Sequence, residues 1–458
     1  MTAGRPMRVD LSNALAERVD GEGVELEALD GLGDELGAIH DRISETRREE
    51  GPYDFLALPE TTEGARIAEV GADLAGDFDH LVQVGIGGSA LGAACLTEAL
   101  APGAPVTVLD NVDPEVTERL TGELDPASTA LHVVSKSGST AETVANALVL
   151  RDWLAESGVD PDDHTVVTTG AESALEDIVA DPRDRFAFPA SVPGRYSALS
   201  PTGLLAPAFA GVDVDAVLAG ARRGVERSRR DAVRDNPAYA LAALSHLLAA
   251  DGKPIHVVMP YVERLERFAD WQAQLLAESL GKRETRDGEV VEAGQTPLPA
   301  MGVTDQHSLL QLFVEGPRDK QYTVIETGGT DGGAGDDDVD GGADATIPEN
   351  DVFPYLGGRS LGELRAAELD GTVASLVDAD RPVTRIALDG ITPSSMGELL
   401  VVTEVAVAVL CELAGVDPFD QPGVESGKRA TYGLLGREGY EGDTDTVKTV
   451  RDPLFVLE

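Results

Sequence analysis

The chain of 458 residues contains little lysine, few aromatic residues and only two cysteines. Lysine accounts for six of its 36 basic residues, and Phe, Trp and Tyr together make up 4% of the sequence. Asp and Glu number 82, so the formal net charge at pH 7 is -46. Such an excess of negative charge argues against nucleic acid as a partner, because a polyanion would be repelled.

The sequence also lacks an apolar run that could cross a membrane. The longest such run, residues 399–413, is shorter than the roughly 20 residues of a spanning helix, and it carries Glu404 and Glu412. Charged residues precede any apolar run at the N-terminus, which is unlike a secretory signal. We therefore expect a cytoplasmic protein without a membrane partner, in which residues 399–413 form a core helix.

Cysteine and histidine are too scarce to indicate a metal centre or a disulfide. Cys95 and Cys411 both fall in apolar helix-like runs, which favours buried thiols. None of the seven histidines has ligand spacing with cysteines or carboxylates, so we expect no metal.

The acid-rich, lysine-poor composition resembles that of halophilic proteins. At about 1 M salt the Debye length falls to roughly 3 Å, which screens the repulsion between surface charges. Our hypothesis is that the surface is adapted to a salt-rich cytoplasm.

Strand-like and helical runs alternate from about residue 80 onwards. The strand-like runs are 81–86, 106–109, 130–134 and 165–168, followed by 255–259, 322–325 and 383–388. Alternation of this kind predicts an α/β protein with parallel sheets covered by helices on both faces. We expect an N-terminal helical segment at 1–60, a first domain at 61–215, a second at 216–440 and a C-terminal tail at 441–458.

A low-complexity segment interrupts the second domain at residues 328–344. Thirteen of its seventeen residues are Gly or Asp. It contains the first half of a calcium-loop pattern, Asp336, Asp338 and Asp340, but Ile347 occupies the position where a glutamate is needed. A flexible acidic surface insertion is the better interpretation.

A glycine-rich turn, residues 85–92, follows the first strand-like run and precedes a helical run. Gly85, Gly87 and Ala90 fit a variant of the dinucleotide fingerprint, and Asp110 ends the next strand. The motif by itself therefore suggests NAD binding. A tight turn that requires glycine explains it equally well.

The turn Ser135–Thr140 lies between the third strand-like run and a helical run. It carries four hydroxyl side chains, a lysine and a glycine in six residues. An ordinary helix cap needs one hydroxyl. The additional hydroxyl groups favour a phosphate site, because free N–H groups and the positive end of the helix dipole lie at such a position.

Four further motifs carry candidate functional groups. Arg195, in a Pro-Gly-Arg-Tyr-Ser segment, has apolar or small neighbours and could stabilise an anion in a cleft. Gln274 and Glu278 are four residues apart on one helical face, and a carboxylate there could act as a general base. His307 alone is more often structural. The segment 421–428 resembles a P-loop only superficially, since Arg429 stands where Ser or Thr is required.

Together these segments resemble the phosphoglucose isomerase (glucose-6-phosphate isomerase) family. The resemblance spans about residues 80 to 435 and rests on blocks 85–92, 135–143, 194–197, 278–282, 304–308 and 421–428. It implies two sugar-isomerase (SIS) domains, each an α-β-α sandwich around a mainly parallel sheet. It also implies reversible conversion of glucose 6-phosphate into fructose 6-phosphate through a cis-enediol, in glycolysis and gluconeogenesis, without cofactor or metal.

The resemblance assigns roles to matching positions. The residues implied to bind substrate are Gly87, Gly88, Ser89, Gly194, Gln274 and Gln421, with Ser135, Lys136, Ser137 and Thr140 on the phosphate. Those implied to be catalytic are Glu278 as the proton shuttle, Arg195 on the enediolate, and His307 and Lys428 in ring opening. In the family the site is completed across a dimer, so a homodimer is implied, with His307 reaching the neighbouring active site.

Three alternatives stay open. The enzyme could also accept mannose 6-phosphate as a bifunctional isomerase. A non-catalytic sugar-phosphate-binding protein of the same fold would need no Glu278. An NAD-dependent dehydrogenase would leave Ser135–Thr140 and Glu278–Lys282 unexplained. Departures from the family pattern at Pro193, Leu280 and Val303 remove none of the proposed functional groups.

Overall fold

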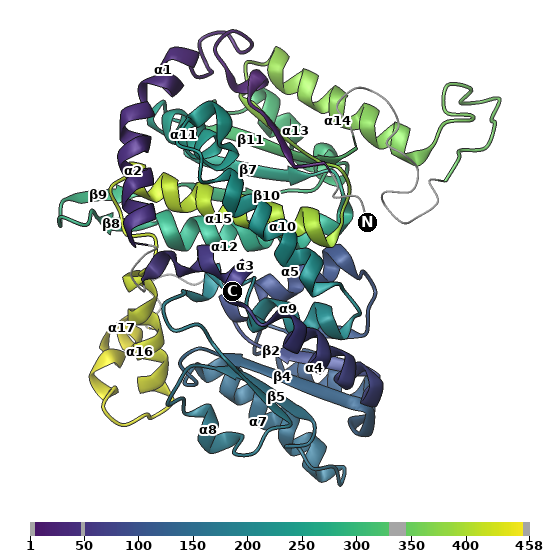
Figure 1. Ribbon diagram of the computed structural model, residues 1–458, viewed down its shortest axis with the longest axis vertical. Helices are drawn as coiled ribbons and strands as arrows, with labels where there is room; N and C mark the ends of the chain where they lie inside the picture. The colour runs from purple at the N-terminus through teal and green to yellow at the C-terminus, as the bar shows by residue number, and fades with distance from the viewer. Residues whose placement is uncertain (1–4, 47–50, 329–344, 452–458) are drawn as a thin grey trace.

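A computed structural model describes residues 5–46, 51–328 and 345–451 of the chain. The acidic insertion at 328–344 and its partial calcium-loop pattern thus fall, apart from Gly328, outside the described residues. Two sheets lie one above the other, and a layer of helices separates them (Figure 1). This arrangement confirms the predicted α/β class with mainly parallel sheets.

The first sheet is entirely parallel, in the order β3-β2-β4-β5-β6. Its central strand β4 is buried at every position, as expected for a parallel strand covered on both faces. Ala130 faces the central helical layer, and Leu131 faces helices on the outer side. The strands are β2 (His80–Val84), β3 (Val106–Leu109), β4 (Thr129–Ser135), β5 (Thr165–Thr169) and β6 (Asp184–Ala187).

Helices cover both faces of this sheet. On the outer face lie α6 (Pro114–Glu123), α7 (Ala141–Glu156) and α8 (Leu175–Ile178). On the inner face lie α4 (Gly64–Asp77), α5 (Leu91–Leu100) and α9 (Pro201–Phe209). The inner helices belong to a hydrophobic core that continues into the second half of the chain.

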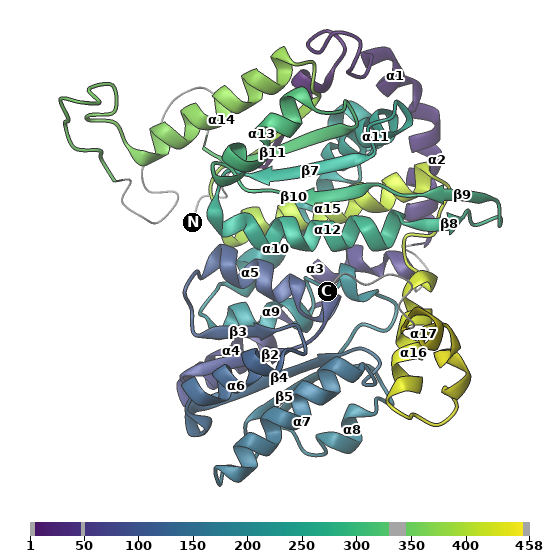
Figure 2. The ribbon, with the colours of Figure 1, turned by 180° about the vertical axis from the view of Figure 1, so that it is seen from behind.

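The second sheet has the order β1-β12-β11-β7-β10 and is parallel except for β1. Its strands are β1 (Arg8–Asp10), β7 (Ile255–Pro260), β10 (Thr296–Pro299), β11 (Lys320–Thr327) and β12 (Val383–Leu388). The outer face packs on α13 (Thr304–Glu315) and α14 (Leu361–Asp378). The inner face packs on α10 (Val214–Arg227), α11 (Pro237–Ala250), α12 (Glu266–Leu280) and α15 (Pro393–Leu413). Figure 2 shows the same layers from behind.

The seven strand-like runs of the sequence all form strands, but five short strands were not predicted. Strand β1 recruits the N-terminal segment to the second sheet, and β6 and β10 lie at sheet edges. The remaining two, β8 (Lys282–Glu284) and β9 (Val290–Ala293), form an antiparallel hairpin. Edge and hairpin strands bury too little to require a continuous apolar run, and the prolines of β10 are tolerated only at an edge.

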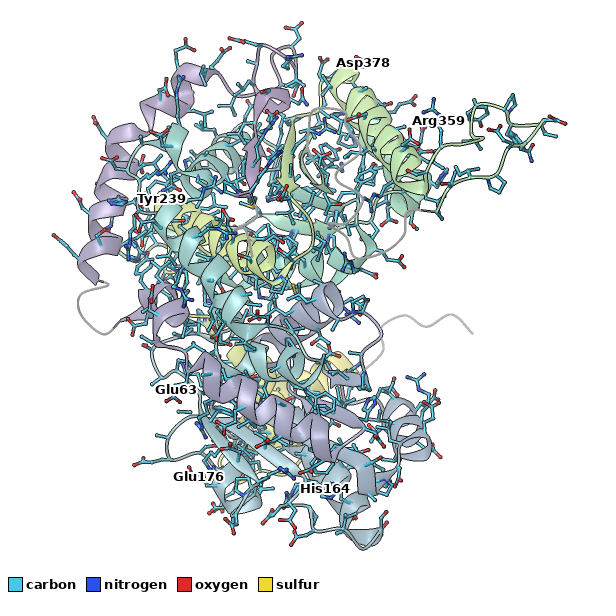
Figure 3. The ribbon with its side chains drawn as sticks, turned by 45° about the vertical axis from the view of Figure 1, so that its right-hand side comes forward. Glu63, His164, Glu176, Tyr239, Arg359 and Asp378 are labelled. Carbon is cyan, nitrogen blue, oxygen red and sulfur yellow. The ribbon has the colours of Figure 1, made fainter. Side chains whose placement is uncertain are left out.

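The described N-terminal segment also contains α1 (Leu26–Gly31), α2 (Gly33–Thr46) and α3 (Leu58–Thr61), whereas residues 15–25 form turns and an isolated bridge. Tyr239 of α11, labelled in Figure 3, hydrogen-bonds through its hydroxyl to His40 Nδ1 of α2 at 3.0 Å. The described C-terminal part forms α16 (Glu425–Leu434) and α17 (Asp445–Arg451). Among the described residues no helix is both long and apolar enough to span a membrane.

The central layer depends on a close crossing of α10 and α15. A Cβ added to Gly220 would lie 1.8 Å from the carbonyl oxygen of Ser394, so only glycine permits this approach. Beside it, the fully buried carboxylate of Glu398 accepts from Arg227 Nη1 at 2.6 Å and Arg223 Nη2 at 3.1 Å. Both cysteines are buried and unpaired, as predicted.

We expect a buried histidine of the first sheet to make folding sensitive to mild acid. His132 bonds Gln83 and Thr168, and burial lowers its pKa from 6.5 to about 3. Below pH 6.5 this histidine is protonated in the unfolded chain but stays neutral in the folded chain. Its contribution to the free energy of unfolding is therefore complete at pH 7 and is lost as the pH falls towards 3. At pH 5 the loss is about 2 kcal/mol.

The measurement is the unfolding midpoint of wild type and His132→Gln at pH 7 and pH 5. Glutamine offers a donor and an acceptor without titrating, so the midpoint of His132→Gln should fall less over this range. Equal acid shifts in the two proteins would contradict the expectation.

Candidate active site

The glycine-rich turn after β2 packs directly against two other predicted segments. A Cβ on Gly88 would lie 2.2 Å from the carbonyl carbon of Gly194. Gly87 has φ +57°, and a Cβ there would lie 2.6 Å from Gln274 Nε2. Glycine is therefore required because protein atoms occupy the space above the turn. This geometry speaks against the dinucleotide interpretation, in which the same glycines would admit a pyrophosphate.

Arg195 is the centre of the polar network at this place, and its side chain is only 1% exposed. Its Nε donates to Ser279 Oγ at 2.9 Å, and Nη1 donates to Gln421 Oε1 at 2.6 Å. Its Nη2 donates to the backbone oxygens of Pro418 and Asp420. A guanidinium held by so many acceptors is fixed in position before any ligand binds.

Glu278 lies in the last turn of α12 with its side chain 31% exposed. Its Oε2 is 3.3 Å from Arg195 Nη1, and its Oε1 accepts from Gln274 Nε2 at 2.9 Å. The i, i+4 spacing predicted this second contact. The Oε1 atom of Gln274 is buried and has no hydrogen-bond partner within the described part of the chain.

The hydroxyl-rich turn connects β4 to α7, as predicted. Ser135 Oγ lies 3.2 Å from Thr140 Oγ1 and accepts from the N–H of Gly138 at 3.1 Å. Gly138 has φ +65°, and a Cβ there would lie 1.7 Å from Ser173 Oγ, which fixes glycine in this turn. The hydroxyls therefore gather at the N-terminus of a sixteen-residue helix, where an anion is favoured.

Lys136 links this turn to the segment that carries Arg195. Its Nζ donates to the backbone oxygen of Val192 at 2.8 Å and lies 5.7 Å from the ring centre of Phe188. Partial desolvation of the ammonium lowers the pKa of Lys136.

Helix α16 also borders both parts of the site. Tyr432 donates its hydroxyl to the backbone oxygen of Ser139 at 3.3 Å, and Gln421 precedes the helix. Lys428, by contrast, is 47% exposed and pairs with Glu425 at 3.1 Å. The structure thus brings Gln421 to Arg195 but leaves Lys428 on the solvent side of its helix.

His307 lies apart from these residues. It is exposed on α13, and within the described residues it makes no hydrogen bond or ion pair. Both ribbon views place α13 beside the upper sheet and α16 beside the lower half of the molecule (Figures 1 and 2). In this chain His307 is therefore no part of the Arg195–Glu278 cluster.

The sequence patterns singled out neither Ser279 nor Lys282, although both lie in the block 278–282 and belong to the network. Ser279 accepts from Arg195 and also from Tyr196, whose hydroxyl is 3.2 Å away. Lys282 donates to backbone oxygens at the end of α12. No spacing rule singles them out, because their partners are distant in the chain or are backbone atoms.

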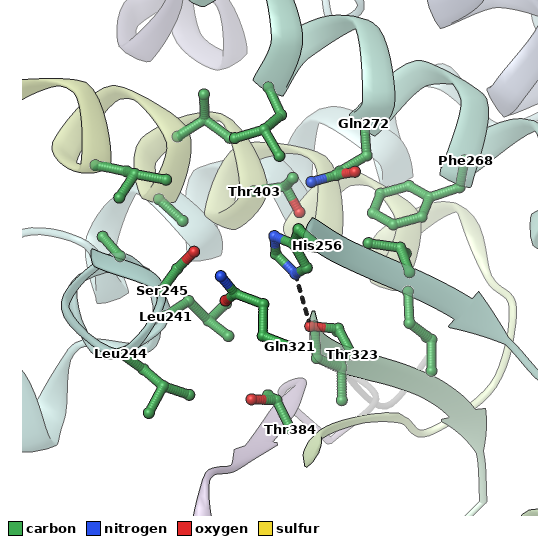
Figure 4. Close-up of a pocket in the computed structure, with 18 residues that line it drawn as sticks. Leu241, Leu244, Ser245, His256, Phe268, Gln272, Gln321, Thr323, Thr384 and Thr403 are labelled. Atoms are coloured by element: carbon green, nitrogen blue, oxygen red, sulfur yellow. Dashed lines mark hydrogen bonds between the residues drawn. The ribbon is translucent and has the colours of Figure 1, made fainter. Parts of the chain in front are cut away.

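A separate cavity of about 60 Å³, lined mostly by apolar side chains with a few polar ones, lies in the second half of the chain (Figure 4). His256 Nε2 bonds Thr323 Oγ1 there at 3.0 Å, while its buried Nδ1 has no partner in the described structure. Gln272 and Leu276 of α12 line this cavity, whereas Gln274 and Glu278 belong to the Arg195 network. The space suits a few water molecules.

Comparison with known proteins identifies the family. The family model described as phosphoglucose isomerase matches residues 61–437. A probable glucose-6-phosphate isomerase of Haloarcula marismortui is 44% identical over 99% of each chain. That of Natronomonas pharaonis is 45% identical, over 97% of this chain and 99% of the relative.

A solved structure is also similar to this chain over most of its length. The crystal structure of a hypothetical protein from Thermus thermophilus superposes with a TM-score of 0.81 at 37% identity, covering 94% of this chain and 99% of that one. The fold and these matches over most of the chain lead to one assignment. The chain belongs to the phosphoglucose isomerase family.

Proposed function

We propose that this chain interconverts glucose 6-phosphate and fructose 6-phosphate by moving a proton between C1 and C2, with Glu278 as the base. The observation that carries the proposal is the placement of Glu278. Its half-buried carboxylate is held by Gln274 on one oxygen and faces the buried guanidinium of Arg195 on the other. A fixed base beside a fixed cation is the arrangement that enolisation requires.

The reaction follows from these two groups. Glu278 takes the proton from C2 of the open-chain aldose, and the electrons of that C–H bond form the C1–C2 double bond as negative charge reaches the carbonyl oxygen. Arg195 stabilises this enediolate. A proton passes between the two substrate oxygens, and Glu278 returns its proton to C1, which yields the ketose without any net redox change.

The phosphate of the substrate is proposed to bind at Ser135, Lys136, Ser137 and Thr140. Hydroxyl and N–H donors at the start of α7 would complement the dianion locally, despite the negative net charge of the chain. The Gly87–Ser89 turn and Gly194 would line the sugar, and Gln274 and Gln421 would orient hydroxyls.

Ring opening is proposed to need His307 and Lys428. His307 is exposed and separate from the Arg195–Glu278 cluster of its own chain. Contribution of His307 to the site of a second copy in a homodimer would reconcile its position with its proposed role.

The test is isotope incorporation without any cofactor. Purified protein is incubated with fructose 6-phosphate in deuterated water containing a metal chelator, and the aldose is analysed by NMR. We expect glucose 6-phosphate carrying deuterium at C2, since the proton on Glu278 exchanges with solvent. Absence of aldose and of exchange would favour the sugar-phosphate-binding alternative, and mannose 6-phosphate as an additional product would favour the bifunctional one.

A further inference from the structure

Lys282 is buried against the helix end that carries Glu278. Its side chain is 5% exposed, and its Nζ donates to the backbone oxygens of Glu278 and Ser279, each at 2.7 Å. The Nζ also lies 3.6 Å from Asp420 Oδ1. All three of these residues contact Arg195 through another atom. Lys282 therefore touches three of the groups that surround the guanidinium.

Two other buried lysines behave differently. Lys253 and Lys320 each pair with a neighbouring carboxylate at 2.5 Å, Asp251 and Asp319. Within the described residues Lys282 has no carboxylate that close, and it directs its donors to helix carbonyls instead. Desolvation, followed by the nearby charge of Arg195, lowers its pKa. Burial therefore disfavours the protonated form of Lys282. Attraction to neighbouring charges alone does not explain why this lysine is buried here.

We propose that Lys282 is a positioning residue that fixes the last turn of α12 and the segment 418–421 around Arg195. This inference rests on the proposed function of Glu278. The carbonyls at a helix C-terminus lack intrahelical partners and attract a cation. Lys282 satisfies two of them directly behind the catalytic carboxylate. Through Asp420 it also holds the segment that supplies Gln421 and two backbone acceptors to Arg195.

The expected consequence is loss of catalytic geometry with little loss of substrate binding. Proton transfer is sensitive to position, and a displacement of about 1 Å can reduce the rate about 100-fold. Within the described residues, the hydrogen bonds of the proposed phosphate-binding turn do not involve Lys282. Binding of the substrate phosphate should therefore survive when Lys282 is changed.

The test compares Lys282→Met with Lys320→Met. Both wild-type side chains are 5% exposed, so the two variants lose a similarly buried ammonium. We expect Lys282→Met to lower kcat by about 10- to 100-fold with KM within about threefold. Its kinetic isotope effect with C2-deuterated glucose 6-phosphate should rise, because proton transfer becomes more rate-limiting. Lys282→Arg, which keeps a charged donor, should recover part of kcat.

Unchanged kcat and isotope effect in Lys282→Met, with a fall in melting temperature like that of Lys320→Met, would reduce Lys282 to a structural residue. If Lys282→Met does not fold, kcat and KM of Lys282→Arg and Asp420→Asn test the proposal instead. Lowered kcat with retained KM in either supports the proposal, and wild-type values in both overturn it. An inactive wild-type protein would instead overturn the proposed function itself.

Discussion

Replacing Glu278 by glutamine should abolish almost all isomerisation while substrate still binds. General-base catalysis contributes about 10²- to 10⁴-fold, so we expect kcat to fall by about three orders of magnitude. Glutamine keeps the length of the side chain and its contact with Gln274. It cannot accept the proton from C2, so deuterium incorporation from solvent should stop as well.

The measurement is kcat, KM and C2 exchange for Glu278→Gln beside Glu266→Gln. Glu266 is exposed in the first turn of the same helix, so its variant should match wild type. Lys136→Met and Thr140→Ala provide the opposite contrast, since they should raise KM more than they lower kcat. Near-normal turnover in Glu278→Gln would remove Glu278 as the base.

Changing Arg195 to lysine should be the second most damaging substitution. The guanidinium makes five hydrogen bonds, to Ser279, Glu278, Gln421 and two backbone oxygens. A lysine has three donors and lacks the planar fork, so it cannot satisfy this set. A lysine would therefore not hold the positive charge in the same place beside the developing oxyanion, and we expect kcat to fall by about 10²- to 10³-fold.

The same substitution should lower the melting temperature, because buried acceptors lose their donors. Arg222→Lys is the matched control. Arg222 lies outside the site, and its Nη1 donates to the backbone oxygen of Pro59 at 2.7 Å. Arg222→Lys should lower the melting temperature slightly and leave kcat unchanged. A fall in melting temperature without a fall in kcat for Arg195→Lys would show that Arg195 supports the fold and not the reaction.

The sequence predicted the buried strands and helices better than the strands at the edges of the sheets. Central strands such as β4 and β11 are covered on both faces, and each contains a run rich in apolar and β-branched residues, 130–134 and 322–325. The predicted core helix at residues 399–413 falls entirely within α15 (Pro393–Leu413). The edge strands β6 and β10 and the N-terminal strand β1 are short and partly exposed, so no pattern identified them.

In the candidate site, too, the sequence predicted the local arrangements best. Local geometry made Gln274 and Glu278 neighbours on α12, and the order of strand, hydroxyl turn and helix placed Ser135–Thr140 at a helix N-terminus. The catalytic roles themselves stay predictions. Lys428 pairs with Glu425 at the surface of this chain, and its role in ring opening is among these predictions.

By itself the sequence determined which chemical groups are available and which local structures present them, because helix periodicity and turn chemistry act over a few residues. Only the tertiary structure decided that Arg195 meets Glu278 and Gln421, which are 83 and 226 residues further along the chain. It also decided that Lys282 lies buried behind Glu278. Contacts across such separations arise from the packing of helices between two sheets, and that packing leaves no periodic signal in the chain.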